Sequence, residues 1–484
     1  MAIDGLARWL LLCCLGSMAA AALPPPVEAA RQAAGLPESA LGLVVWPLAG
    51  GPPRLEHRAD AAMNPASAMK LITGLAALER LGPAYSWRTT LYGDGPIVAG
   101  TLEGNLYLQG GGDPRFTFEQ LWLLLRQLRA RGVQRIAGDL VLDRSRYRLS
   151  ADPAANFDEQ PERAYHVDGD ALLVNFKAQK FEFESDDGQV TVRVEPPLDG
   201  LQVSSRQQLV DLPCERWPTL WQRPEIRRDS AGIALEFIGE FPRHCRAERY
   251  LALFDHADFA GRLTLALWRE LGGSVAGTVR QGPVPEAARQ LGEWESAELG
   301  SQLRDLLKFS NNTMARAFYL SLGADLQAID PDAAGFDTAA AAERAVQAAL
   351  ASLGLDFPEL VVENGSGLSR LGRVSPRHLA ELLRVARAHR YGDDFYAALP
   401  VLGVDGTLRR RLDGTPLAGQ GRLKTGTLDE VRALAGLMHD ATGRPWIVVA
   451  LVNDPRAEAS MPLLDALLRW VWTLSDQDPP SHPG

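Results

Sequence analysis

The sequence predicts an α/β domain that is split in two by a β-rich insertion. A buried strand and then an amphipathic helix are predicted near the N-terminus. This pattern of apolar residues changes at about residue 88. Short alternating apolar runs separated by Gly-rich turns then continue to about residue 287. Long helical patterns return after a Pro/Ala-rich stretch, which marks the second boundary. We therefore expect a discontinuous domain, residues 23–87 and 288–484, around an insertion, residues 88–287, that forms two subdomains.

The split domain contains the helical patterns and a closing pair of strands. Residues 40–47 are predicted as a buried strand, and Leu71, Ile72, Leu75 and Leu78 then repeat at helical spacing, which places Ser67 in the first turn of a helix. The later elements are expected to be helices at 299–322 and 339–353, antiparallel strands at 433–439 and 446–453, and a helix at 461–474.

The insertion reads as short strands with one interrupting helix. A tight hairpin is predicted at Glu103-Gly104, and an amphipathic helix at 116–131. The strands are expected at 88–92, 97–102, 105–109, 135–142, 189–195 and 233–237.

The N-terminus has the pattern of a cleaved signal peptide. Arg8 precedes an apolar run at 9–15, and a small-residue tract at 19–22 follows, so cleavage is expected after Ala22. The apolar run is shorter than the roughly 20 residues that a spanning helix needs, so we expect export without a transmembrane anchor. Cleavage would leave two cysteines, Cys214 and Cys245, which form either one disulfide or two separate buried thiols.

Composition excludes several classes of protein. Of 484 residues, 46% are hydrophobic and 23% charged, which is typical of a globular chain and not of a disordered or polytopic membrane protein. The net charge of -10 opposes binding to nucleic acid phosphates. Only five lysines are present, so the position of each is informative: Lys70, Lys177, Lys180, Lys308 and Lys424.

The first candidate for chemistry is a serine and a lysine three residues apart. The sequence has no Gly-x-Gly-x-x-Gly, Walker A, His-Glu-x-x-His or Gly-x-Ser-x-Gly motif, and its eight histidines lack metal-ligand spacing. On a helix, Ser67 and Lys70 would lie on one face within mutual reach. A lysine whose pKa is lowered by desolvation can take the proton from a serine hydroxyl, so this pair predicts a nucleophile and its base.

A second polar cluster, Ser310-Asn311-Asn312, lies between apolar helical stretches. One interpretation is a helix cap or a turn. In the functional interpretation, Ser310 relays a proton to a leaving amine and Asn312 donates to a substrate carbonyl.

A third cluster, Lys424-Thr425-Gly426-Thr427, precedes an apolar strand. It could be an ordinary turn. Functionally, Lys424 and the Thr425 hydroxyl would hold a carboxylate, and Gly426 would let a substrate backbone approach the strand edge. The N–H of Thr427 would form an oxyanion hole with that of Ser67.

Together the three motifs resemble those of serine penicillin-recognising enzymes, and the flanking sequence resembles the type-4, class C penicillin-binding proteins. The resemblance covers nearly the whole mature chain and includes an insertion between the first two motifs. The segments that carry it are residues 64–71 (Asn-Pro-Ala-Ser-Ala-Met-Lys-Leu), 110–114 (Gly-Gly-Gly-Asp-Pro), 364–370 (Asn-Gly-Ser-Gly-Leu-Ser-Arg) and 403–408 (Gly-Val-Asp-Gly-Thr-Leu).

This resemblance implies a serine penicillin-recognising fold of the transpeptidase/β-lactamase type, without a metal or cofactor. The implied activity is that of a serine-type D-Ala-D-Ala carboxypeptidase or D,D-endopeptidase of peptidoglycan, acting on stem peptides that end in D-Ala-D-Ala and inhibited by β-lactams. The implied roles are nucleophile for Ser67, acylation base for Lys70, relay and carbonyl donor for Ser310 and Asn312, and carboxylate and oxyanion contacts for Lys424, Thr425 and Thr427.

Two further points follow from the resemblance. An acidic residue near the cleft can receive the ammonium of a diaminopimelate side chain; Asp158 is the candidate, with Asp152 and Glu159 as competitors. The alternative functions are a β-lactamase and a catalytically silent cell-wall-binding protein with the same fold. The large insertion favours a peptidoglycan enzyme over a compact β-lactamase.

Overall fold

A computed structural model describes residues 22–150, 162–229 and 232–474. Residues 1–21 of the predicted signal peptide and the predicted side-chain contacts Asp152, Asp158 and Glu159 lie outside the described residues. No helix within the described ranges is both long enough and apolar enough to cross a membrane.

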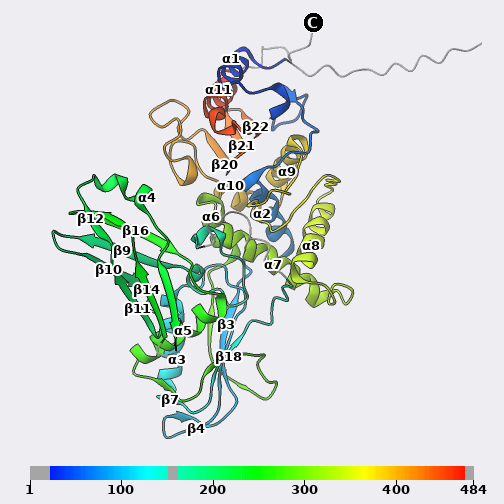
Figure 1. Ribbon diagram of the computed structural model, residues 1–484. Coiled ribbons are helices and arrows are strands. Elements are labelled where there is room, and N and C mark those ends of the chain that lie inside the picture. The colour runs from blue at the N-terminus through cyan, green and yellow to red at the C-terminus, as the bar shows by residue number, and fades with distance from the viewer. Residues whose placement is uncertain (1–21, 151–161, 230–231, 475–484) are drawn as a thin grey trace, which may run out of the picture.

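An antiparallel five-stranded sheet, in the order β2-β1-β22-β21-β20, forms the centre of the split domain (Figure 1). Its strands come from both ends of the chain, because β1 pairs with β22 over seven residues from Leu41↔Val452 to Pro47↔Trp446. The strands are β1 (Leu41–Pro47), β2 (Leu55–His57), β20 (Gly421–Leu428), β21 (Val431–His439) and β22 (Pro445–Asn453). Strand β20 is left at the edge of the sheet.

Helices cover both faces of this sheet, and the side chains of successive residues in β22 therefore point alternately into two cores. Ile447, Val449 and Leu451 point to the larger core, which includes α2 and α7, whereas Val448 and Ala450 point to the side of α1 and α11. The helices are α1 (Pro25–Ala33), α2 (Met69–Arg80), α6 (Leu299–Lys308), α7 (Asn312–Ile329), α8 (Thr338–Ser352), α9 (Pro376–Ala388), α10 (Gly392–Ala397) and α11 (Met461–Trp472). The expected helix at 299–322 is thus two helices, because the chain breaks at the polar triplet that begins with Ser310.

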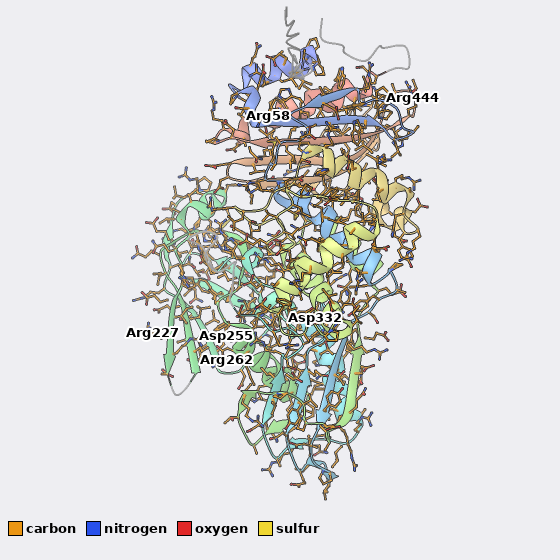
Figure 2. The ribbon with its side chains drawn as sticks, turned by 90° about the vertical axis from the view of Figure 1, so that its right-hand side faces the viewer. Arg58, Arg227, Asp255, Arg262, Asp332 and Arg444 are labelled. Carbon is orange, nitrogen blue, oxygen red and sulfur yellow. A yellow bond between two sulfur atoms is a disulfide. The ribbon has the colours of Figure 1, made fainter. Side chains whose placement is uncertain are left out.

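The inserted region contains two groups of sheets, each around its own core. In the first group, helices α3 (Phe118–Ala130) and α5 (His256–Glu270) pack on strands β3 (Arg88–Gly93), β4 (Ile97–Val98), β5 (Thr101–Leu102), β6 (Leu106–Gln109), β7 (Arg135–Ile136), β8 (Leu140–Asp143), β17 (Ser274–Val275), β18 (Val279–Gln281) and β19 (Arg289–Glu295). In Figure 2, the labelled Asp255 and Arg262 lie in the inserted region, far from Arg58 and Arg444 of the split domain.

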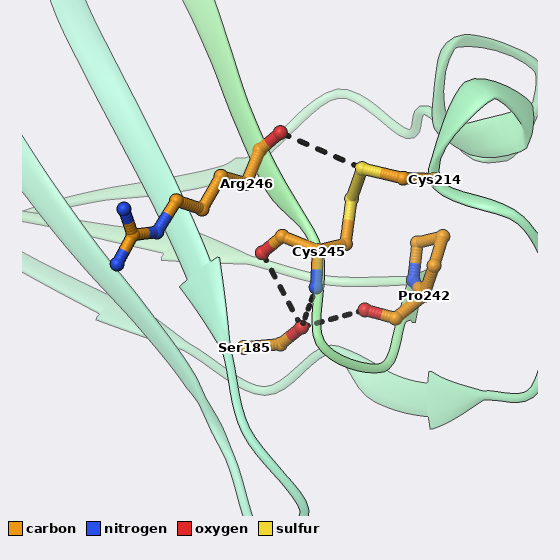
Figure 3. Close-up of a disulfide and its surroundings, with 5 residues drawn as sticks. All are labelled: Ser185, Cys214, Pro242, Cys245 and Arg246. Atoms are coloured by element: carbon orange, nitrogen blue, oxygen red, sulfur yellow. Dashed lines mark hydrogen bonds between the residues drawn. A yellow bond between two sulfur atoms is a disulfide. The ribbon is translucent and has the colours of Figure 1, made fainter.

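The second group is a β-rich lobe with an aromatic core of Phe181, Phe183, Phe237, Phe241 and Trp217. It contains β9 (Gln179–Ser185), β10 (Val190–Glu195), β11 (Leu201–Ser205), β12 (Gln208–Val210), β13 (Glu225–Asp229), β14 (Gly232–Phe237), β15 (Glu240–Pro242), β16 (Arg246–Leu251) and the short helix α4 (Trp217–Leu220). Cys214 and Cys245 form a disulfide in this lobe (Figure 3). The single bridge is therefore the correct one of the two alternatives.

Several details of the insertion differ from the sequence prediction. The expected strands at 97–102 and 135–142 are each two strands, β4 and β5, and β7 and β8. The tight hairpin lies at Ala99-Gly100, between β4 and β5, and not at Glu103-Gly104. Both turn residues have positive φ, 47° and 84°, which suits a two-residue hairpin. Strand β19 pairs with β3, so we propose that the inserted region continues to about residue 295, beyond the expected boundary at 287.

Removal of the disulfide is expected to destabilise the β-rich lobe. The Cys214→Ala/Cys245→Ala variant loses the restraint that the bridge places on a 31-residue loop of the unfolded chain. We expect a loss of about 3 to 4 kcal/mol in the free energy of unfolding of this lobe, measured by urea denaturation followed by tryptophan fluorescence. Reduction of the wild-type protein should give the same shift. An unchanged urea midpoint in both experiments would contradict the prediction.

Candidate active site

The structure brings the three motifs together at the β20 edge of the five-stranded sheet. Ser67 lies in a 3₁₀ turn, Ala66–Ala68, that runs straight into α2, so Lys70 follows one helical turn later. Asn312 opens α7, and Lys424 lies on β20. A cleft of about 1210 Å³ is lined by Ser67, Ser310 and Asn312 and by residues 425–427.

Lys70 is fully buried and has three polar neighbours. Its Nζ lies 2.9 Å from Ser67 Oγ, 2.7 Å from Asn312 Oδ1 and 2.5 Å from the carbonyl oxygen of Ser366. Burial, with the nearby charges of Lys424 and Arg316, holds the pKa of Lys70 well below its usual value. A neutral amine has two N–H donors and one lone pair. The two carbonyl oxygens and the hydroxyl of Ser67 match these three sites in number, so the neutral form of Lys70 would be fully satisfied here.

Lys424 is also fully buried. Its Nζ donates to Ser310 Oγ at 2.8 Å and to the carbonyl oxygen of Thr425 at 2.7 Å. Burial lowers its pKa to about 7. Because an anion close to this amine would favour the charged form, the site is suited to a ligand that brings a carboxylate.

The Ser310-Asn311-Asn312 segment serves as a helix cap and also supplies polar groups to the cleft. Asn311 is the N-cap of α7, with its side chain accepting from the N–H of Met314 at 2.9 Å. Ser310 has φ 55°, a left-handed conformation that is uncommon for serine. The nitrogen Nδ2 of Asn312 donates to the carbonyl oxygen of Tyr165 at 3.2 Å, which links this motif to the insertion.

The backbone around Ser67 is held by contacts that sequence reasoning missed. Asn64 accepts from the N–H of Ala66 at 2.8 Å and donates to the carbonyl oxygen of Ser369 at the same distance. Gly367 has φ 74°, and a Cβ there would lie 1.9 Å from the carbonyl oxygen of Ala66. At Gly426, a Cβ would lie 2.6 Å from the carbonyl oxygen of Pro65. Both glycines allow close backbone packing around the Ser67 turn.

Side chains in and next to the cleft include several that sequence reasoning did not assign. Thr407 and Thr425 share a hydroxyl hydrogen bond of 2.8 Å. Lys308, whose side chain is 5% exposed, pairs with Asp405 at 2.6 Å. The scarcity of lysine could have drawn attention to Lys308. The contact of Lys70 with the carbonyl oxygen of Ser366 could not be predicted in this way, because every residue has a backbone carbonyl.

The chain is similar to known proteins over most of its length. A family model described as the D-Ala-D-Ala carboxypeptidase 3 (S13) family matches residues 26–472. The D-alanyl-D-alanine carboxypeptidase of Actinomadura sp. (strain R39) is 30% identical over 450 residues, which cover 88% of this chain and 80% of the relative. The D-alanyl-D-alanine carboxypeptidase DacB of Haemophilus influenzae is 26% identical over 414 residues, 82% of each chain.

A solved structure has the same fold. Penicillin binding protein 4 (dacB) from Haemophilus influenzae superposes with a TM-score of 0.75 at 24% identity, covering 91% of this chain and 99% of that one. This agreement confirms the predicted penicillin-recognising fold. With a family model that spans almost the entire described chain, this protein belongs to the D-Ala-D-Ala carboxypeptidase 3 (S13) family of peptidases.

Proposed function

We propose that this chain is a periplasmic serine-type D-Ala-D-Ala carboxypeptidase and D,D-endopeptidase that acts on peptidoglycan stem peptides and is acylated by penicillins. The observation that carries the proposal is the contact between the hydroxyl of Ser67 and the fully buried amine of Lys70. Membership of the peptidase family supports the same reaction class. The signal-peptide pattern of residues 1–22 supports export.

In the proposed acylation step, neutral Lys70 takes the proton of Ser67 as Oγ attacks the carbonyl carbon of the D-Ala-D-Ala bond. The negative charge that develops on the carbonyl oxygen is stabilised by the backbone N–H groups of Ser67 and Thr427. Asn312 keeps its Oδ1 on Lys70 while its Nδ2, which carries two N–H bonds, donates to the substrate carbonyl.

The leaving amine then takes a proton. We assign Ser310, which lines the same cleft as Ser67, the relay that passes the proton from Lys70 to this amine, so that Lys70 is neutral again for the next step. The terminal carboxylate binds Lys424 and the hydroxyl of Thr425. Water subsequently hydrolyses the ester on Ser67 and frees the shortened peptide. Asp158 remains our candidate for binding the ammonium group of the substrate side chain.

Replacement of the nucleophile is expected to abolish penicillin labelling. Wild-type protein incubated with a fluorescent penicillin should carry a stable label that mass mapping assigns to Ser67, and Ser67→Ala should carry none. The exposed Ser204→Ala variant is the matched control and should be labelled like wild type. Intact penicillin without a label would favour the silent cell-wall-binding alternative, and penicillin consumed without a label would favour a β-lactamase.

The pH dependence of acylation should report the lowered pKa of Lys70. Because the neutral amine is the reactive form, the rate of penicillin acylation should rise with pH as Lys70 loses its proton, and then level off. Since the pKa of Lys70 is lowered, the plateau should begin well below the ordinary lysine value of 10.5. Stopped-flow acylation across a pH series measures this. A rate that climbs without a plateau up to that value would rule out Lys70 as a neutral base.

Gly367→Ala is expected to slow acylation, because the added Cβ would collide with the carbonyl oxygen of Ala66 and displace the Ser67 turn. We expect a labelling rate at least about tenfold lower, since small misplacements of a nucleophile are costly. Gly354→Ala is the matched control: its φ of 72° imposes the same backbone strain, but nothing lies within 4 Å of the new Cβ. Equal labelling rates in the two variants would show that the close contact at Gly367 is unimportant.

A further inference from the structure

The cleft continues beyond the groups assigned to the substrate carboxylate. From Ser67 it runs past Thr425 and Thr427 to the N-terminal end of α11, where Met461 and Leu464 line it. The segment 406–412 also lines the cleft, in contact with β20 through Thr407 and with α11 through Arg411. The space of about 1210 Å³ is much larger than a terminal D-alanine requires, so the cleft has room for a larger leaving group.

The 406–412 wall is held firmly against the catalytic elements. At its start, Asp405 accepts from Lys308, at the end of α6, and from the N–H of Val401. Leu408 is buried in the core on the α11 side of the sheet. Arg411 donates from Nε to Asp465 of α11 at 2.7 Å. The backbone of this wall is therefore held by contacts at both ends.

This wall carries an excess of positive charge. Arg409, Arg410, Arg411 and Arg432 line the cleft, together with a single carboxylate, Asp465. Arg411 uses that carboxylate, and Arg432 donates to two backbone carbonyls. Arg409 and Arg410 are exposed, and no carboxylate in the described ranges forms an ion pair with either. The chain as a whole has a net charge of -10, so a local excess of arginines without carboxylate partners favours the binding of an anionic ligand.

We infer that Arg409 and Arg410 bind carboxylates on the leaving side of a cross-linked peptide dimer. This inference rests on the proposed function. A released D-alanine has one carboxylate, which Lys424 and Thr425 already receive. The further arginines therefore suit a leaving amine that belongs to a second, anionic stem peptide, since a guanidinium pairs with carboxylates in a two-pronged geometry.

In that reaction the amide C–N bond of the cross-link breaks as its carbonyl carbon bonds to Ser67 Oγ. The leaving amine takes the relayed proton and departs with its peptide along the arginine wall. The segment thus determines specificity in favour of cross-link cleavage over release of a single D-alanine.

The test compares two substrates with the same acyl donor, one releasing D-alanine and one releasing an anionic stem peptide. The value of kcat/KM is measured for each with wild type and with Arg409→Gln/Arg410→Gln. We expect the ratio of cross-linked to D-alanine substrate to fall about tenfold in the variant, and the difference to shrink at high salt. The exposed pair Arg135→Gln/Arg289→Gln, on the insertion, removes the same charge and should leave the ratio unchanged.

The possible outcomes separate this inference from the proposed function. If both substrates are cleaved and the ratio is the same in wild type and variant, the arginine site is overturned and the peptidase assignment stands. If the control pair lowers the ratio equally, general charge explains the effect and the site is also overturned. If wild type is labelled by penicillin on Ser67 and cleaves neither substrate, both proposals fail.

Discussion

The active site depends on the burial of one amine. Lys70 is inaccessible to water, and its three polar neighbours come from separate parts of the chain: Ser67 in the turn before α2, Asn312 at the start of α7 and Ser366 in a glycine turn. A charged lysine there would suffer a large desolvation penalty, whereas the neutral amine has a partner for each N–H and for its lone pair. The packing that brings these segments together therefore also favours the neutral amine, the form that the proposed acylation requires of Lys70.

The burial of Lys70 also explains the unusual backbone around the site. A small interior space for Lys70 requires the Ser67 turn to touch both β20 and the glycine turn, which is possible only without side chains at Gly426 and Gly367. Ala66 and Ser310 adopt positive φ values of 44° and 55°, at a cost in backbone energy that the surrounding hydrogen bonds and core must offset. The segments around Ser67 and Ser310 thus include strained backbone positions, whereas the neighbouring strands β20 and β21 pair without a register shift.

The motifs and the split architecture could be predicted from the sequence, because both depend on residue types. The motifs are recognised by their side-chain chemistry, and the architecture by the periodicity of apolar residues. Sequence reasoning placed Ser67, Lys70, Ser310, Asn312 and Lys424, and the structure brings these residues to one cleft. It could not find the carbonyl oxygen of Ser366, because every residue has a carbonyl. It misplaced the hairpin of β4 and β5, because Ala99 gives no indication of its positive φ. The pairing of β19 with β3 joins residues about 200 positions apart, beyond the reach of local patterns.

The basic residues at the cleft are of two kinds, buried lysines and exposed arginines, which differ in their physical properties. Lys70 and Lys424 are buried, and burial lowers the pKa of both, that of Lys424 to about 7. The arginines at 409 and 410 are exposed and remain charged at any pH at which the protein is folded. Attraction of an anionic substrate therefore does not require Lys424 to be charged beforehand. The arriving carboxylate itself favours protonation of Lys424, and the resulting ammonium group then pairs with that carboxylate.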